Sequence, residues 1–215
     1  MTSEEMKEEL SEYLDHIRLA NDRYVALTSL YKSIECYNKE INYAPGFFTI
    51  AIYALADSCC SELAKLYCGS DKEKTLSKLF NIILANIHVF KKKVVTEYRD
   101  ADNPSKVFMT EEYNVNIKLE VTNAIIKKNN MKCVIDKLKS RRDKYLAHND
   151  KEYFKLAMIA ERLPISLVEI QHLISFAGDF CNTMQGYLDG HIVTYNTIGA
   201  DDLPKLFQIM YEHGI

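Results

Sequence analysis

Two arginines and a histidine lie in one short segment of the sequence, and together they could bind and react with a phosphate. Arg141 and Arg142 are followed by Asp143, Lys144 and, a few positions later, His148. A guanidinium group can hold phosphate oxygens by paired hydrogen bonds. An imidazole, with an ordinary pKa near ~6.5, can take up or release a proton at neutral pH. The segment therefore gathers the groups that a phosphate-bearing ligand would need.

The residues that lead into this segment are basic, although the chain as a whole is slightly acidic. The formal net charge is −3, which argues against contact with nucleic acid over the whole surface. Between residues 127 and 142, however, Asp136 is the only acidic side chain among these cations: Lys127, Lys128, Lys132, Lys137, Lys139, Arg141 and Arg142. Two interpretations stay open, namely a local face that binds phosphate groups and a solvated helix surface.

Arg142 occupies a helix position at which an apolar residue is expected. Met131, Ile135 and Leu138 define the centre of a buried stripe, and at ~100° per residue Arg142 falls within about 20° of that centre. A guanidinium cannot shed its proton, so burying it without a partner is costly. We therefore expect Arg142 to have a partner. It could be a bound anion, or a carboxylate in an ion pair that joins two helices.

Cap signals and apolar spacing predict that helices position this segment. Thr2 with Glu5, and Ser166 with Glu169, have the spacing of capping boxes that begin long helices. Further helices are expected from Pro45 to about residue 67, over residues 76–94, over 115–128, from Met131 through the Arg/His segment, and after Asp201. Residues 100–112 are expected to be a connector, and we find no alternating strand pattern of useful length.

These elements predict an all-α, up-and-down helical bundle of about six to seven helices. With 7 glycines and 4 prolines in 215 residues, the chain favours long helices, and its length suits a single domain over residues 1–215. The helix after Ser166 has an apolar stripe formed by Leu167, Ile170, Ile174, Ala177, Cys181, Met184 and Leu188. We interpret this stripe as bundle core, with a dimerisation seam as the alternative.

Composition and cysteine spacing exclude several classes of protein. None of the 6 cysteines lies in a CxxC pair or at zinc-finger spacing, so we expect no metal site and no cofactor. Free cysteines in apolar helical patterns suit a reducing compartment. The charged N-terminus does not resemble a signal peptide, and no apolar run approaches the ~20 residues of a membrane span. We expect a cytoplasmic protein that does not bind a membrane.

The run Arg-Arg-Asp-Lys-Tyr-Leu-Ala-His-Asn-Asp resembles the signature of the HEPN superfamily, in which an arginine precedes a histidine by a short spacer. Arg142 and Arg141 stand 5 and 6 intervening residues before His148, and both satisfy that pattern. The form RDK-x-x-AH-x-D is most similar to the abortive-infection branch, AbiU. Pro45-Gly46-Phe47-Phe48 and residues 54–67 also resemble that branch. The resemblance covers roughly residues 45–155 and implies a HEPN-like core over about 45–190.

What the resemblance implies is a dimer that cleaves RNA without a metal, as a toxin or abortive-infection protein. Arg142, His148 and Asp143 would then be the catalytic residues, and Arg141, Lys144, Lys139 and Lys137 would contact RNA. Cleavage by the neighbouring 2′-OH needs a base, an acid and cations around the phosphate. Since one histidine cannot be base and acid in the same step, a two-fold dimer would supply both from two copies of His148. Asp143 would orient Arg142 or His148.

Other functions remain open beside this one. Many HEPN proteins are inactive, so a non-catalytic module that binds RNA, a nucleotide or a partner protein is the main alternative. A helical protein in which the Arg/His segment only joins helices is the other. The partners implied are a second copy, RNA and an antitoxin protein. Asp150 stands where related toxins carry a modified tyrosine, so regulation by that modification is not expected.

Overall fold

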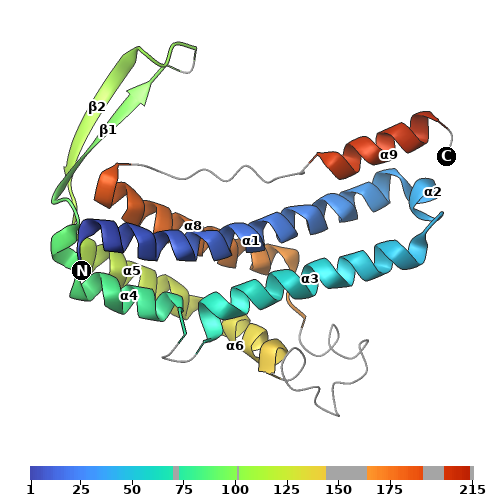
Figure 1. The fold of residues 1–215 in the computed structure, drawn as a ribbon, viewed down its shortest axis with the longest axis horizontal. Coiled ribbons are helices and arrows are strands. Elements are labelled where there is room, and N and C mark those ends of the chain that lie inside the picture. Colours follow the sequence, from blue (N-terminus) through green and yellow to red (C-terminus); the bar gives the residue numbers. More distant parts are fainter. Residues whose placement is uncertain (70–72, 101, 144–163, 191–200, 214–215) are drawn as a thin grey trace.

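The computed structural model describes residues 1–69, 73–100, 102–143, 164–190 and 201–213 (Figure 1). Helices dominate these residues, which confirms the predicted fold class. In chain order, the elements are α1 (Ser3–Cys36), α2 (Asn38–Ile41), α3 (Pro45–Cys68), α4 (Leu76–Ala85), the 3-10 turn η1 (Ile87–Val89), β1 (Lys93–Arg99), β2 (Val107–Asn114), α5 (Ile117–Asn130), α6 (Lys132–Arg141), α8 (Leu167–Asp189) and α9 (Asp202–Glu212).

Two of the long helices begin at the capping boxes that the sequence predicts. At α1, the Glu5 backbone N–H donates to Thr2 Oγ1 over 3.2 Å, and the Thr2 N–H donates to the Glu5 carboxylate over 2.7 Å. Ser166 and Glu169 make the same reciprocal pair at the start of α8. Each box satisfies backbone donors that a helix start would otherwise leave unpaired.

The core lies where α1, the second half of α3, and α8 pack together. Most of the predicted α8 stripe is buried there within the single chain, at Ile170, Ile174, Ala177, Cys181, Met184 and Leu188. This burial confirms the interpretation of the stripe as bundle core, because its side chains are not available to a second copy. The shorter helices α4, α5 and α6 complete the bundle beside α3.

A β-hairpin replaces the elements predicted between residues 86 and 114. The expected helix over 76–94 ends at Ala85, and β1 pairs antiparallel with β2 from Lys93↔Asn114 to Tyr98↔Met109. The prediction of a connector without strands was therefore wrong, as was that of a helix continuing to residue 94. The β-branched run at residues 94–96 favours a strand locally, but apolar residues that happened to fall at helical spacing obscured it.

The hairpin projects from the bundle, and a second projection extends from the opposite end (Figure 1). This second projection, which we call the arm, consists of residues 28–56: the end of α1, then α2, then the first half of α3. Helix α9 lies along it. Phe207 of α9 is fully buried, with its ring stacked on Tyr37 at a centroid distance of 5.6 Å and against Phe48 at 5.5 Å. The aromatic contacts hold α9 to the arm.

Helix α3 alone among the described helices is long and apolar enough, by length and composition, to cross a membrane. No such run was expected from the sequence. The helix qualifies because Asp57 is its only charged residue before Glu62. The second half of α3 lies in the bundle core, as core helices of similar composition do. Only 28% of the most apolar 18-residue stretch of the helix is buried, however.

Candidate functional site

The two arginines stand at the end of α6, next to the second half of α3. Arg141 is the last residue of α6, and Arg142 caps it. Helix α6 packs against α3, with Leu138 almost completely buried between the helices of the bundle. The apolar stripe of α6 thus sets both guanidinium groups against α3, that of Arg142 at the C-terminal end and that of Arg141 beside Asp57, near the middle of the helix.

Arg142 has the partners that its position requires. Its Nε donates to Asp143 Oδ1 over 2.7 Å, and its Nη1 donates to the backbone carbonyl of Cys68. Cys68 is the last residue of α3, where helix carbonyls lack intrahelical donors and the helix dipole favours a cation. The side chain remains 30% exposed. Arg142 therefore satisfies the end of α3 and keeps part of its guanidinium accessible.

Arg141 is more deeply buried than Arg142, in contrast to the helical-wheel expectation. Its side chain is 13% exposed, and Nη2 lies 3.2 Å from Asp57 Oδ1 on α3. The wheel places residues relative to the stripe of α6 alone, whereas the crossing of α3 decides which guanidinium is covered. Arg141 thus forms an ion pair that joins two helices, which is the structural interpretation that the sequence left open.

Further basic groups surround the end of α3. Lys128 of α5 donates to Ser77 Oγ over 2.7 Å, and its partial burial lowers the pKa of the ammonium group. Lys139 is exposed.

Burial raises the pKa of the Cys68 thiol to about 11, although the nearby Arg142 acts in the opposite direction. Cys68 is therefore a neutral thiol at neutral pH and a poor nucleophile.

The predicted site residues do not all lie in one place in the structure. Arg142, Asp143 and Lys139 lie near the end of α3, whereas Arg141 lies beside Asp57, near the middle of that helix. Lys137 instead pairs with Glu169 at the start of α8, over 3.1 Å. Lys144 and His148 lie outside the described residues. Sequence reasoning missed Asp57 and the Cys68 carbonyl, and no local signal marks either, because both belong to a helix far away in the chain.

The charges of this cluster are largely compensated. Arg141 faces Asp57, and Arg142 faces Asp143, so an incoming phosphate would have to compete with two carboxylates. Lys128 and Lys139 form no ion pair with any described residue that the structure records. They are the cations that leave the end of α3 with a local positive charge.

A second polar cluster lies between α1 and α3, apart from the predicted segment. Glu62 is buried and contacts His16 Nδ1 at 3.0 Å, Lys65 Nζ at 2.9 Å and Arg23 Nη1 at 3.7 Å. Burial opposes ionisation of this carboxyl, but hydrogen bonds from Lys65 and His16 outweigh it and lower the pKa of Glu62. We interpret this cluster as structural, because it joins two core helices. Within the described parts of the chain, no group of acidic, Cys and His side chains could hold a metal ion.

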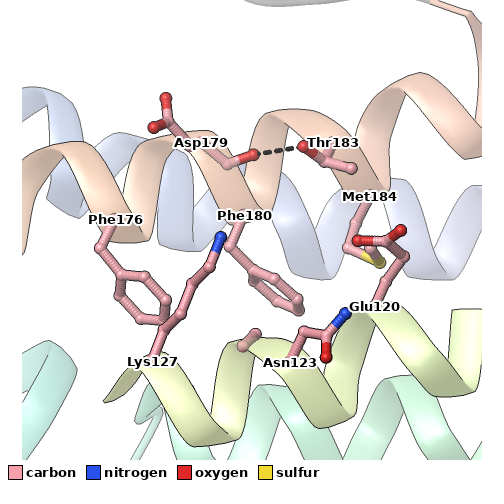
Figure 2. Close-up of a pocket in the computed structure, with 9 residues that line it drawn as sticks. Glu120, Asn123, Lys127, Phe176, Asp179, Phe180, Thr183 and Met184 are labelled. Atoms are coloured by element: carbon pink, nitrogen blue, oxygen red, sulfur yellow. Dashed lines mark hydrogen bonds between the residues drawn. The ribbon is translucent and has the colours of Figure 1, made fainter. Parts of the chain in front are cut away.

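Figure 2 shows a shallow pocket on a different face, between α5 and α8. Phe176 and Phe180 lie on one side of it, and Lys127 and Glu120 reach in from α5. Its volume is about 140 Å³, enough for a few water molecules. Thr183 donates to the Asp179 carbonyl over 2.7 Å, within α8. The lining mixes polar with apolar side chains, and the pocket is too small for a nucleotide.

Comparison with known proteins finds a family whose sequence model matches this chain. A HEPN family model, described as AbiU2, matches residues 3–204. The match extends beyond the region of the sequence resemblance at both ends and includes the whole Arg/His segment. No curated protein and no solved structure matches the chain.

Proposed function

The chain belongs to the AbiU2 family of HEPN proteins, a family of abortive-infection modules, and on that premise we propose that it is a metal-independent endoribonuclease that acts as a dimer. The observation that carries the proposal is the position of Arg142. Its guanidinium is aligned by Asp143 and the Cys68 carbonyl, yet remains partly exposed. In sequence it stands just before His148.

In this proposal, the exposed N–H groups of Arg142 bind the scissile phosphate. Asp143 and the end of α3 hold the guanidinium in place, so that less freedom is lost when RNA binds. Lys139, and Lys144 beyond it in sequence, contact neighbouring phosphates. Arg141 acts through its ion pair with Asp57, which fixes the end of α6 against α3.

The proposed reaction is attack of the RNA 2′-oxygen on the adjacent phosphorus. One histidine removes the 2′-OH proton, the new P–O bond forms, and the bond to the 5′-oxygen breaks. A second group must protonate that leaving oxygen. Two copies of His148, one from each subunit, would supply the base and the acid. Positive charge from the arginines would stabilise the charge that gathers on the phosphate oxygens.

The proposal also includes the compartment in which the protein acts, its biological role and a protein partner. We propose that the protein acts in the cytoplasm, in defence against phage, and that an antitoxin protein restrains it. These parts derive from membership of the family and from composition. Each depends on the nuclease activity being present.

A second candidate function is a non-catalytic module that binds RNA or a protein partner through the same face. One observation favours it: both arginines are paired with carboxylates in the described structure. A site arranged for rapid catalysis would benefit from arginines whose charge is not already neutralised by neighbouring carboxylates. In this alternative, Lys128 and Lys139 would supply most of the attraction for phosphate.

Incubation of the purified protein with a generic RNA in EDTA separates the two functions. The nuclease should cleave RNA, and His148→Ala should reduce the rate by about 100-fold or more. Arg142→Ala should act similarly, whereas Arg99→Ala, an exposed arginine on the hairpin, should leave the rate unchanged. Binding without cleavage, with affinity that falls steeply as salt rises, would instead support the binding module.

A further inference from the structure

Strand β1 of the projecting hairpin has one edge that pairs with β2 and one that pairs with no described strand. Among the described residues, the sheet consists of these two strands. Next to the start of their pairing, the Val115 N–H donates to the Lys92 carbonyl over 2.9 Å. Because bonded and non-bonded pairs alternate between antiparallel strands, Val95 and Glu97 direct their backbone N–H and C=O groups away from β2.

This edge lacks the features that usually prevent pairing with another chain. Lysines, prolines and bulges are the common means of protecting an edge strand. The bulge of this hairpin lies beyond Tyr98, and residues 94–97 include neither lysine nor proline. The outward backbone groups of β1 are therefore available to a further strand.

A groove runs along the same edge, between β1 and the C-terminal end of α8, beside which the hairpin rises (Figure 1). Residues 94–97 line one wall together with Tyr113 of β2, and Gly186, Tyr187 and Gly190 line the other. Consecutive residues of a strand point to opposite faces, so a wall with four in a row is the edge of the strand. The two glycines have no side chain, which lets another backbone approach closely.

The size of the groove fits one extended strand. Its volume is about 650 Å³. One residue of a strand fills ~160 Å³, from a rise of ~3.3 Å, a strand spacing of ~4.8 Å and a sheet thickness of ~10 Å. The groove therefore has room for about four residues of a single strand, which matches the length of the β1 edge that lines it.

The same features decide among the kinds of partner. RNA needs cations, and no lysine or arginine is among the described residues that line the groove. A second copy of the chain offers its described strands only as a joined pair, which needs about twice the room of one strand. A single extended segment of a different protein fits both the unpaired backbone groups and the volume.

We infer that the groove binds an extended segment of a partner protein, which adds a third strand to the hairpin at the edge of β1. Tyr113 and Tyr187 both line the groove, and side chains alternate along a strand. Every second residue of the bound segment should therefore be apolar. This interaction goes beyond the proposed function and does not depend on RNA cleavage.

Random eight-residue peptides, selected for binding to the purified protein, are the probe that tests the inference. Val95→Pro should weaken the binding of selected peptides about 10-fold or more, because it removes an outward N–H from the β1 edge. The matched control is Thr110→Pro. Thr110 pairs with Glu97, so its backbone also points outward, but at the free edge of β2. Both variants should cleave RNA as the wild type does.

A second measurement needs no variant of the protein. Methylation of alternate backbone nitrogens of a selected peptide should abolish binding in one register and preserve it in the other, since alternate N–H groups face β1. The bound peptide should protect the Val95 and Glu97 amides from hydrogen exchange.

Four results would overturn the inference: no enrichment of peptides, equal binding to Val95→Pro, equal binding of both methylated forms, or loss of binding only in Thr110→Pro. Protection of the Val95 amide before any peptide is added would also overturn it, because this chain or a second copy would then already cover the edge.

Discussion

The two halves of α3 lie in opposite environments, although the first half, which has no charged residue, is the more apolar in sequence. Cys59 to Cys68 pack into the core beside α1 and end against Arg142, whereas Phe47, Ile50 and Tyr53 face solvent on the arm. Nothing within the helix accounts for this difference. It arises because α8 and α6 pack beside the second half, whereas, among the described helices, α1 and α9 lie beside the first. An apolar helix face therefore indicates burial without indicating what buries it.

The largest effect that separates the halves should be on stability. Leu63 is fully buried, so Leu63→Ala should lower the free energy of unfolding by about 2 to 5 kcal/mol through lost contacts and a residual cavity. Ile50→Ala should change it by less than about 0.5 kcal/mol. Denaturant unfolding, at protein concentrations below the dissociation constant of the dimer, measures both changes in unfolding free energy. Equal losses would show that the first half is also packed within the monomer.

A smaller effect is expected at the boundary between the halves, where Asp57 meets Arg141. Asp57→Ala leaves a mostly buried guanidinium without its carboxylate and should cost about 1 to 3 kcal/mol of unfolding free energy. Asp15→Ala is the matched control, because its ion pair with Arg18 is exposed on both sides and contributes little. A double-mutant cycle with Arg141→Met gives the coupling. A coupling no larger than that of the exposed pair would remove the role assigned to Asp57.

The buried half should also respond to pH through Glu62. Its pKa is lowered in the folded protein, so the unfolded chain binds more protons. The resulting stability is complete above the ordinary carboxyl pKa, ~4.3, and is lost as the pH falls through the lowered value. The stability gap between wild type and Glu62→Gln should therefore narrow from pH 7 towards pH 3. The exposed Glu4→Gln should produce no such gap, and a constant gap for Glu62→Gln would contradict the assignment.

The smallest effect is one of reactivity, at the end of α3. Burial raises the pKa of the Cys68 thiol to about 11, so little thiolate is present near pH 8. A thiol reagent should label the exposed Cys36 and Cys133 quickly and leave Cys68 unmodified, as peptide mass spectrometry would show. Rapid labelling of Cys68 in the folded protein would mean that the end of α3 opens readily.

Most of the helical framework could be predicted from local signals. Both capping boxes and the start of α3 at Pro45 follow from residues next to each other in sequence. The hairpin could not be predicted in this way, because its strands are exposed on almost every residue and so lack the alternation of a half-buried sheet. Without that alternation, helical spacing in the preceding residues was the stronger signal.

The candidate site shows the same division. The sequence alone located the Arg/His segment, the need of Arg142 for a partner and the burial of the α8 stripe, since each depends on residue type and helical spacing. The tertiary structure decided that Arg141 is the more buried arginine, that Asp57 and the Cys68 carbonyl are the distant partners, and that half of α3 stays exposed. These depend on which helices cross, and crossing is set by packing between residues far apart in the chain, which no local pattern records.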